Sequence, residues 1–325
     1  MPEQKRIVVM GGGTGTFVAL TGLKNYPVHL SAIITMMDSG GSTGRLRDQL
    51  GVLPPGDLRQ ALVALSASDK LWRDLFLYRF ENGDLKGHNF GNIFISALEK
   101  VTGSLDEAVD VATTILDAQG DVIPVTFEKA DLCVELKNGV VIEGETHIDE
   151  PEEQDERPSI KRAFLKPKIH ANRDARTAIE KADLIVIGPG DLYTSIIPNL
   201  LVEGVADAIQ QSKAKKVFVM NLMTKYGQTT DYTAKDHVAD LQTYIDGALD
   251  VVLVNNKQPD PKALSWYEQS QEEVVKDDLN GQEFKTVRAS LLDSVFIQKS
   301  SADTLKRSLI RHDPKKLAKV LIALL

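Results

Sequence analysis

Five short runs of apolar, mostly β-branched residues are separated by segments with the spacing of amphipathic helices. Runs of this length, ended by glycine or polar residues, predict buried strands. Segment 16–26 predicts the first helix between them, and 315–325 predicts a terminal helix. Alternating strands and helices predict an α/β fold with right-handed crossovers and a mostly parallel sheet. The predicted strands span residues 6–10, 29–37, 183–187, 215–223 and 250–256.

The stretch from 121 to 148 has a different pattern. Apolar and polar residues alternate there, and an Asn-Gly pair at 138–139 is typical of a tight hairpin turn. We therefore expect short antiparallel strands that form a β insertion over about 121–170, within a single domain of residues 1–325. The acidic, proline-containing segment 149–157 predicts an exposed, mobile loop.

The composition suits a globular protein with a large core: 325 residues, 42% hydrophobic and 26% charged. The 38 basic and 46 acidic residues give a formal net charge of −8, which argues against a protein that holds nucleic acid by bulk electrostatics. The single cysteine, Cys133, predicts a small buried side chain rather than a nucleophile. We see no secretory pattern and no apolar run near the ~20 residues of a membrane span, so we expect a cytoplasmic protein.

A glycine-rich string, GGGTG, directly follows the first predicted strand. Glycines let a phosphate approach the backbone, and the helix that follows offers unpaired N–H groups and a partial positive charge. The string fits G-x-G-x-x-T, so Thr16 replaces the third glycine of the dinucleotide fingerprint. Its place in a doubly wound sheet favours ligand binding over a plain tight turn. The predicted ligand contacts are Gly11, Gly12, Gly13, Thr14 and Gly15.

The second predicted strand ends in a similar loop, DSGGSTGRLR. Asp38 is placed to accept a hydrogen bond from a ribose hydroxyl or to hold a metal, and Arg45 and Arg47 are suited to pairing with phosphate. The alternative treats Asp38 as a helix N-cap and the arginines as a solvated face. A second glycine loop after a successive strand makes that alternative weaker. The predicted ligand contacts are Asp38, Gly40, Gly41, Ser42 and Arg45.

Two further polar motifs precede predicted helices. In PPGD, Asp57 is either a helix N-cap, which this segment alone favours, or a metal ligand or catalytic base. In GHNFGN, residues 87–92, His88 is a candidate acid–base group or ligand contact. A single histidine without a visible partner is more often structural. The candidate ligand contacts in this motif are His88, Asn89 and Asn92.

A third glycine loop, IGPGDLYTS, follows the strand predicted at 183–187. Ligands of doubly wound sheets bind at the carboxyl ends of the strands, where the strand order reverses, so we expect the glycine loops to meet there. A capped turn is the structural alternative. Motifs for a P-loop, a zinc protease, a redox dithiol or a serine nucleophile are absent from the sequence. The predicted ligand contacts are Gly188, Gly190, Asp191, Tyr193, Thr194 and Ser195.

Together the motifs resemble the YvcK family of gluconeogenesis factors, which belongs to the superfamily of 2-phospho-L-lactate transferase (CofD). The resemblance runs from about residue 5 to the C-terminal helix. It implies a Rossmann-like, three-layer α/β sandwich and a nucleotide-type ligand. The motifs that support it are RIVVMGGGTG, DSGGSTGRLR, PPGDLRQALVALS, GHNFGN and IGPGDLYTSIIPNLLV, in this order.

The resemblance also implies a function. YvcK-like proteins are associated with UDP-sugars, UDP-N-acetylglucosamine in particular, and with cell shape and envelope supply during gluconeogenic growth. It places two ligand contacts near the C-terminus: Tyr267, which would stack on a base, and Arg311, which would pair with a diphosphate. We therefore expect a nucleotide-sugar-binding regulatory protein with envelope regulatory proteins as partners. Association into a homo-oligomer stays open.

CofD itself is an enzyme. The resemblance places Asp57 of this chain at an acidic position that is a metal or catalytic position in CofD. A magnesium-dependent, CofD-like transferase that uses Asp57 as its catalytic group, with Asp57 and Asp38 as metal ligands, is therefore the alternative hypothesis. Ser39 stands where the family often has a second aspartate, which weakens that metal site. A third hypothesis is a scaffold whose acidic segment 149–157 binds a partner.

Overall fold

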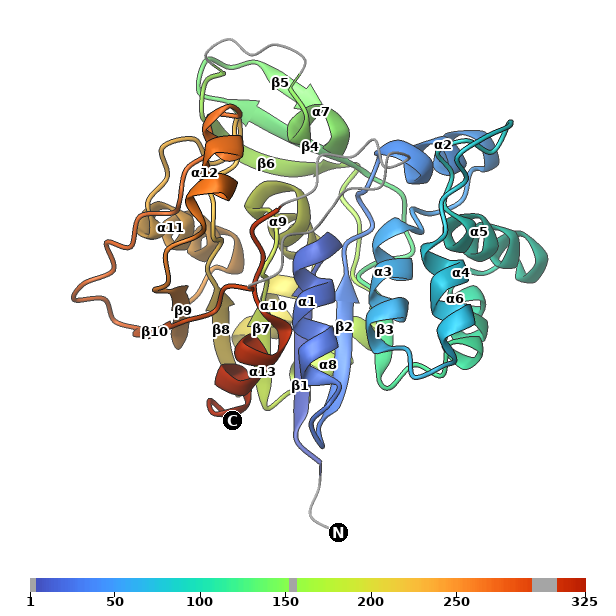
Figure 1. The fold of residues 1–325 in the computed structure, drawn as a ribbon, viewed down its shortest axis with the longest axis horizontal. Helices are drawn as coiled ribbons and strands as arrows, with labels where there is room; N and C mark the ends of the chain where they lie inside the picture. Colours follow the sequence, from blue (N-terminus) through green and yellow to red (C-terminus); the bar gives the residue numbers. More distant parts are fainter. Residues whose placement is uncertain (1–3, 152–156, 294–308) are drawn as a thin grey trace.

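A parallel sheet in the order β10-β9-β8-β7-β1-β2-β3 forms the centre of the computed structural model, which describes residues 4–151, 157–293 and 309–325 (Figure 1). The order reverses between β1 and β7, as it does between the two halves of a Rossmann fold. All five strands expected from the apolar runs belong to this sheet. Its strands are β1 (Arg6–Gly11), β2 (His29–Ile34), β3 (Asp121–Pro124), β7 (Leu184–Ile187), β8 (Lys215–Val219), β9 (Val251–Asn255) and β10 (Lys285–Ala289).

Helices cover both faces of the sheet. In Figure 1, α1, α3 and α13 lie in front of it, and α8 and α10 lie behind it. Because both faces are covered, the central strands are apolar over most of their length. The predicted three-layer α/β sandwich is confirmed. The helices are α1 (Gly13–Leu23), α2 (Gly41–Leu50), α3 (Gly56–Leu65), α4 (Lys70–Leu77), α5 (Phe90–Thr102), α6 (Leu105–Ile115), α7 (Glu145–Asp149), α8 (Arg173–Glu180), π-helical η1 (Leu192–Ile196), α9 (Ile197–Leu200), α10 (Val205–Gln211), α11 (Ala234–Ile245), α12 (Pro261–Glu268) and α13 (Pro314–Ile322).

A small antiparallel sheet in the order β5-β4-β6 sits above the carboxyl ends of the main strands (Figure 1). The expected turn at 138–139 joins β4 to β5. The insertion starts later than predicted, because β3 pairs in parallel with β2 in the main sheet. As an edge strand, β3 is only partly covered, and this explains its alternating pattern. The three strands are β4 (Asp131–Leu136), β5 (Val141–Glu143) and β6 (Ile160–Lys166).

Two other features differ from the sequence prediction. The glycine loop predicted after Asp38 is largely helical, since α2 begins at Gly41 and buries Ser42 and Thr43 in its first turn. The edge strand β10 was not predicted, because its sequence, KTVRA, contains two charged residues and no apolar run, and the strand is partly exposed. Cys133 is buried in β4, as expected. Of the acidic segment 149–157, residues 152–156 lie outside the described residues.

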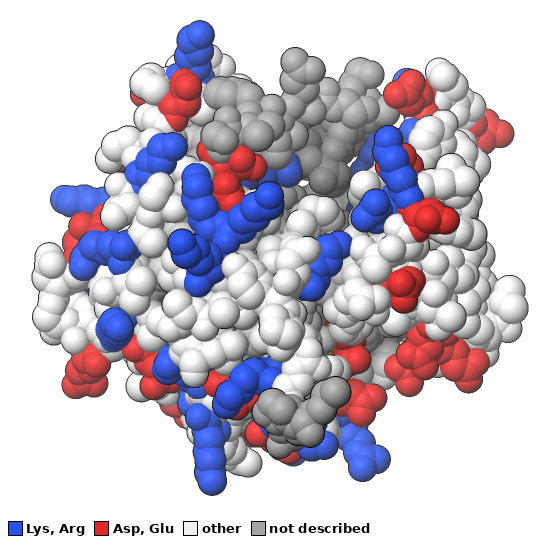
Figure 2. Space-filling view, turned by 60° about the horizontal axis from the view of Figure 1, so that its bottom comes forward, with Lys and Arg blue, Asp and Glu red and all other residues white. Residues whose placement is uncertain are grey.

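The distribution of charged side chains on the surface bears on nucleic-acid binding. On the face drawn in Figure 2, basic and acidic side chains are interspersed, without a continuous basic stripe. Such a mixed face does not favour binding to a phosphate backbone. In the part of the chain that the structure describes, we find no helix with the length and apolar character needed to cross a bilayer.

Candidate functional site

A cavity of about 260 Å³ opens at the carboxyl ends of β1, β2, β7 and β8, where the strand order reverses. This is the position at which doubly wound sheets bind their ligands. The cavity unites parts of four sequence motifs with two C-terminal residues. The predicted contacts that line it are Gly12, Gly13, Thr14, Gly15, Asp38, Gly40, Asp57, Gly190, Asp191, Thr194, Ser195, Tyr267 and Arg311.

The first and third glycine loops meet in the cavity wall. A Cβ at Gly15 would clash with the carbonyl oxygen of Pro189, and a Cβ at Gly12 would clash with the Asp57 carboxylate. Glycine at these positions therefore allows α1 to begin directly against its neighbours. Gly12 is the N-cap of α1 and provides no side-chain hydrogen bond to the first turn. The N–H groups of this turn are suited to an anionic ligand.

Three carboxylates gather on the β2 side of the cavity: Asp38, Asp57 and Glu145. Asp57 is not the N-cap of α3; that position is occupied by Pro55, and Asp57 lies in the first helical turn. Burial raises the pKa of Asp38, and burial together with the nearby charge of Asp38 raises the pKa of Glu145 well above its usual value. Thr146, next to Glu145, bonds with the Ser39 hydroxyl at 2.9 Å, so the insertion closes this side of the cavity.

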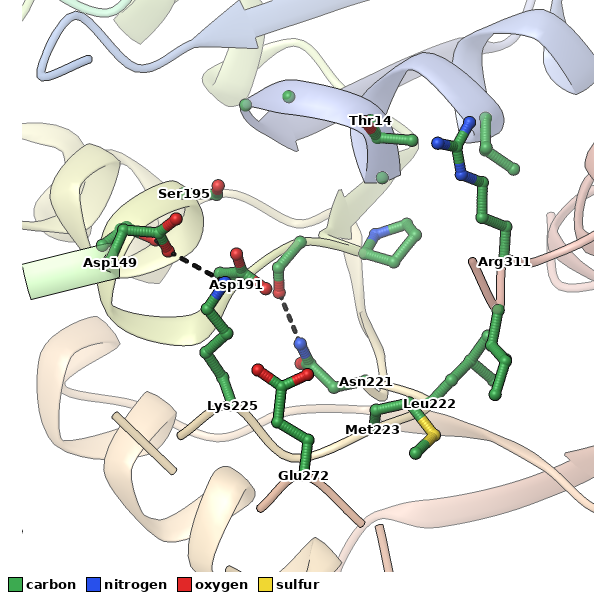
Figure 3. A pocket seen from close by; sticks show the side chains of 18 of the residues that line it. Thr14, Asp149, Asp191, Ser195, Asn221, Leu222, Met223, Lys225, Glu272 and Arg311 are labelled. Atoms are coloured by element: carbon green, nitrogen blue, oxygen red, sulfur yellow. Dashed lines mark hydrogen bonds and ion pairs between the residues drawn. The ribbon is translucent and has the colours of Figure 1, made fainter. Parts of the chain in front are cut away.

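A buried cation lies among acids in the centre of the cavity (Figure 3). The Lys225 ammonium is 3.5 Å from the Asp149 carboxylate, and Asp191 and Glu272 line the same space. Burial alone would favour the neutral amine, but the charges of Asp191, Asp149 and Glu272 raise the pKa of Lys225. Burial raises the pKa of Asp191, and Lys225 partly offsets this. Lys225 is therefore charged and balances the negative charges of Asp149, Asp191 and Glu272.

The C-terminal segment reaches back over the glycine loop. The Tyr267 side chain is buried, and its hydroxyl accepts hydrogen bonds from the backbone N–H groups of Leu309 and Ile310 at 2.8 and 3.1 Å. In Figure 3 the Arg311 side chain extends towards Thr14 at the start of α1. Tyr267 therefore positions the segment that presents Arg311. The neighbouring Trp266 ring is the more exposed aromatic surface on the lining.

The GHNFGN motif lies outside the lining and joins helices instead. Asn89 is the N-cap of α5, and Asn92 accepts a hydrogen bond from Arg59 at 2.7 Å. The His88 ring is 3.2 Å from the Ser42 hydroxyl, and burial followed by the charges of nearby arginines lowers the pKa of His88. These contacts indicate that the motif holds α2, α3 and α5 together. The predicted contacts outside the lining are Gly11, Gly41, Ser42, Arg45, His88, Asn89, Asn92, Gly188 and Tyr193.

Tyr193 is outside the lining because its side chain is turned towards α11. Its hydroxyl donates to the Asp240 carboxylate at 2.5 Å, and the Tyr232 hydroxyl donates to the same carboxylate at 2.8 Å. The neighbours of Tyr193 in η1, Thr194 and Ser195, face the cavity instead. Tyr193 therefore anchors the π-helical turn whose other side contributes hydroxyl groups to the site.

Asp38 and Asp57, the metal ligands of the alternative hypothesis, both line the cavity. No three or more His, Cys, Asp or Glu side chains of the described residues are arranged to hold a metal. One Asp38 oxygen already accepts the Gly40 N–H at 2.9 Å, and the Ser39 hydroxyl pairs with Thr146. We therefore derive no chemical step through a metal.

The sequence motifs did not indicate the lining residues that come from the insertion and from the loop after β8. The insertion contributes Glu145, Thr146 and Asp149, and no strand end marks them in the sequence. Asn221 and Lys225 follow the buried strand β8 in the sequence VMNLMTK. Polar residues just after a predicted parallel strand are a usable signal, because all such strands end at the same edge of the sheet.

We predict that His312 makes the protein less stable in mild acid. His312 lines the cavity, is 5% exposed, and its Nε2 atom has no hydrogen-bond partner within the described residues. Burial lowers the pKa of His312 from 6.5 to about 4. Below pH 6.5 the unfolded chain binds a proton that the folded chain does not, so stability is lost as the pH falls. The expected loss at pH 5 is about 2 kcal/mol.

Urea unfolding of the wild type and His312→Gln at pH 7.5, 6.5 and 5.0 measures this effect. The difference in free energy of unfolding between the two proteins should shift by about 2 kcal/mol in favour of the variant on acidification. His170, whose side chain is 72% exposed, provides the control substitution His170→Gln. Parallel pH profiles for wild type and His312→Gln would show that His312 is not the group responsible.

Comparisons with known proteins agree with this architecture. The family model described as 2-phospho-L-lactate transferase CofD matches residues 7–294. The chain is 39% identical to the gluconeogenesis factor of Bacillus subtilis, covering 100% of this chain and 99% of that protein. It is 40% identical to the putative gluconeogenesis factor of Thermotoga maritima, covering 97% and 98% of the two chains.

A solved structure shows the same fold. It is the crystal structure of a member of the UPF0052 family from Bacillus halodurans, 37% identical to this chain, with a TM-score of 0.90. The match covers 99% of this chain and 100% of that one. Because the family model matches residues 7–294, which is most of the sequence, the chain belongs to the CofD family.

Proposed function

We propose that the protein is a cytoplasmic regulatory protein that binds a nucleotide-sugar of the UDP-N-acetylglucosamine type. The observation that supports this most is the meeting of two glycine loops at the reversal of the strand order, with the start of α1 facing the cavity. Such a wall suits a diphosphate. Arg311 and the hydroxyls of Thr194 and Ser195 add donors around the same space.

The proposed biological role is control of envelope supply and cell morphogenesis during gluconeogenic growth. The relatives named gluconeogenesis factors, which match the chain over its whole length, support the link to gluconeogenesis. A factor that binds a nucleotide-sugar without consuming it would report the level of that metabolite to envelope regulatory proteins. The third glycine of the dinucleotide fingerprint is missing, which favours this ligand class over NAD.

Calorimetric titration with UDP-N-acetylglucosamine, UDP-glucose and NAD tests the proposal. We expect saturable binding of UDP-N-acetylglucosamine and no heat with NAD. The absence of binding by either UDP-sugar at millimolar concentration would refute it. Chromatography of the ligand after prolonged incubation with magnesium and candidate acceptors tests the CofD-like transferase alternative, since any transfer product would show turnover.

We predict that Arg311→Ala weakens binding of the UDP-sugar about 10- to 50-fold, because a guanidinium–phosphate pair is a strong, charge-assisted contact. Arg311→Lys should recover only part of the affinity, since a lysine cannot form the bidentate pair. Arg176, which is 55% exposed on α8, supplies the control Arg176→Ala. Equal dissociation constants for wild type and Arg311→Ala would remove Arg311 from the binding site.

A further inference from the structure

A second groove opens along the outer edge of the main sheet, away from the cavity described above. β3 is the last strand of the sheet on the side opposite β10, and α6 and α8 pack against it (Figure 1). The groove between these elements has a volume of about 340 Å³. Its lining has no residue in common with that of the cavity, so it is a separate feature of the surface.

The outer edge of β3 has backbone groups available for one more strand, because β3 pairs with β2 on one side only. The register places Pro124 beside Ile34, whose carbonyl oxygen accepts the N–H of Val125 at 2.9 Å. In a parallel ladder, alternate residues direct both backbone groups to the same neighbour, so Val122 directs its N–H and carbonyl away from β2. Asn172 already donates to the Pro124 carbonyl at 3.2 Å. The available part of the edge is therefore centred on Val122.

The floor of the groove is partly apolar. Val109 of α6 lies on one side of β3 and Ala178 of α8 on the other, and Ile123 lies between them on the strand. The side chains of Ile123 and Ala178 are only partly covered. Successive side chains of an extended chain point to opposite sides, so a strand added here would pack on both helices.

Three carboxylates converge on one end of the groove: Asp106, Asp110 and Asp174. All three are exposed, and none forms an ion pair with another of the described residues. Partial burial, followed by the nearby charges of Asp110 and Asp174, raises the pKa of Asp106. Asp106 and Asp174 lie in first helical turns, where acids are favourable, but this does not explain why they converge across the groove. A cation between them would relieve their mutual repulsion.

The cations that line the groove lie at its other end. Lys181 follows α8 just before β7, and Arg6 begins β1, so both lie near the amino ends of the strands. Asp121 lies at this end too and is paired with His29 at 2.8 Å. The charge of the groove is therefore divided, with an acidic end beside the starts of α6 and α8.

We propose that the edge of β3 binds an extended, basic segment of a partner protein as an additional strand. The backbone of the segment pairs with Val122, and a lysine or arginine side chain lies between Asp106 and Asp174. A phosphate backbone or an anionic lipid surface does not suit the acidic end, because it has the same sign of charge. The apolar floor and the available strand edge favour a polypeptide over a small cation. This inference goes beyond the proposed function and does not depend on a nucleotide-sugar.

Fluorescence anisotropy with a labelled Lys-Val-Lys-Val-Lys peptide tests the charge recognition, with Glu-Val-Glu-Val-Glu as the acidic counterpart. We expect saturable binding of the basic peptide and none of the acidic one. Asp106→Asn/Asp174→Asn should weaken the basic peptide about fivefold, as expected for two exposed ion pairs. Asp207→Asn/Asp246→Asn removes two exposed acids elsewhere and should leave the affinity unchanged, which controls for net charge.

Two further measurements test the pairing with the strand edge. Val122→Pro removes the outward N–H without removing a bond to β2 and should weaken the basic peptide about tenfold. Val122→Ala, which also shortens the side chain but keeps the N–H, should retain most of the affinity, and thermal unfolding verifies that both variants are folded. The basic peptide N-methylated at every internal residue makes the same test on the wild-type protein and should also bind about tenfold more weakly.

Each result decides for or against the proposal. If the basic peptide does not bind at millimolar concentration, or the acidic peptide binds equally well, the groove does not recognise a basic segment. Unchanged affinity in Asp106→Asn/Asp174→Asn has the same meaning. If the N-methylated peptide binds as tightly as the unmodified one, the segment is not held as an added strand, and the proposal is wrong.

Discussion

Gly15→Ala should abolish measurable ligand binding and lower the free energy of unfolding by about 3 kcal/mol. The added Cβ would clash with the Pro189 carbonyl oxygen and lie 2.9 Å from the Gly190 nitrogen. Both neighbours are backbone atoms, so no side-chain rotation relieves the contact. Either α1 or the loop after β7 must move, and this displaces the N–H groups at the start of α1 that face the cavity. Urea unfolding and calorimetry measure the two effects.

Gly247→Ala is the matched control for this substitution. Gly247 is exposed, and the closest atoms to an added Cβ are 3.6 Å away, which is ordinary van der Waals contact. This control should bind ligand like the wild type and unfold at the same urea concentration. If Gly15→Ala behaves in the same way, the two glycine loops are not in close contact, and the architecture of the cavity wall proposed above is wrong.

The fold was largely predictable because each central strand is apolar on both faces. Runs such as 184–187 have no polar position, and a parallel sheet with helices on both sides explains that pattern. The edge strands β3 and β10 were less predictable, because they are covered less than the central strands. Residues 121–124 and 285–289 are covered on fewer sides, so their alternating or charged patterns resemble antiparallel strands or loops.

The site was predictable where it depends on backbone and unpredictable where it depends on tertiary packing. The glycine loops 11–15 and 188–190 follow strands, and the topology alone brings them together. Sequence cannot tell that His88 packs against Ser42 or that Tyr193 turns towards Asp240. Both depend on which face of a short helix is covered by a distant element. Lys225 was missed because its acidic partners come from other loops.

That cation is central to the charge balance of the cavity. Asp149, Asp191 and Glu272 lie around Lys225, and the side chains of Lys225 and Asp149 are only 18% and 23% exposed. Buried carboxylates of this number are tolerated because a charge of opposite sign is close to them. Under the proposed function, the diphosphate would then be held by the glycine loops and Arg311, since the Lys225 charge is already shared among acids.

Lys225→Met should lower the free energy of unfolding by about 3–5 kcal/mol at pH 8, because it leaves buried carboxylates without their cation. The loss should be smaller at pH 5. Burial already raises the pKa of Asp191, and removal of the lysine raises it further. The folded variant then binds protons that the unfolded chain does not, so its stability falls as the pH rises. Urea unfolding at pH 5, 6.5 and 8 measures this dependence.

The double variant Lys225→Met/Asp149→Asn separates a lost charge balance from lost packing. Neutralising Asp149 removes one of the carboxylates left without a cation, so the double variant should be more stable than Lys225→Met alone at pH 8, by about 1–2 kcal/mol. Lys213→Met, at an exposed position, should leave stability unchanged and give the effect of the substitution itself. If the double variant is less stable than either single variant at every pH, the lysine acts by packing its aliphatic chain. The stability of the fold around Asp149, Asp191 and Glu272 would then not depend on the charge of Lys225.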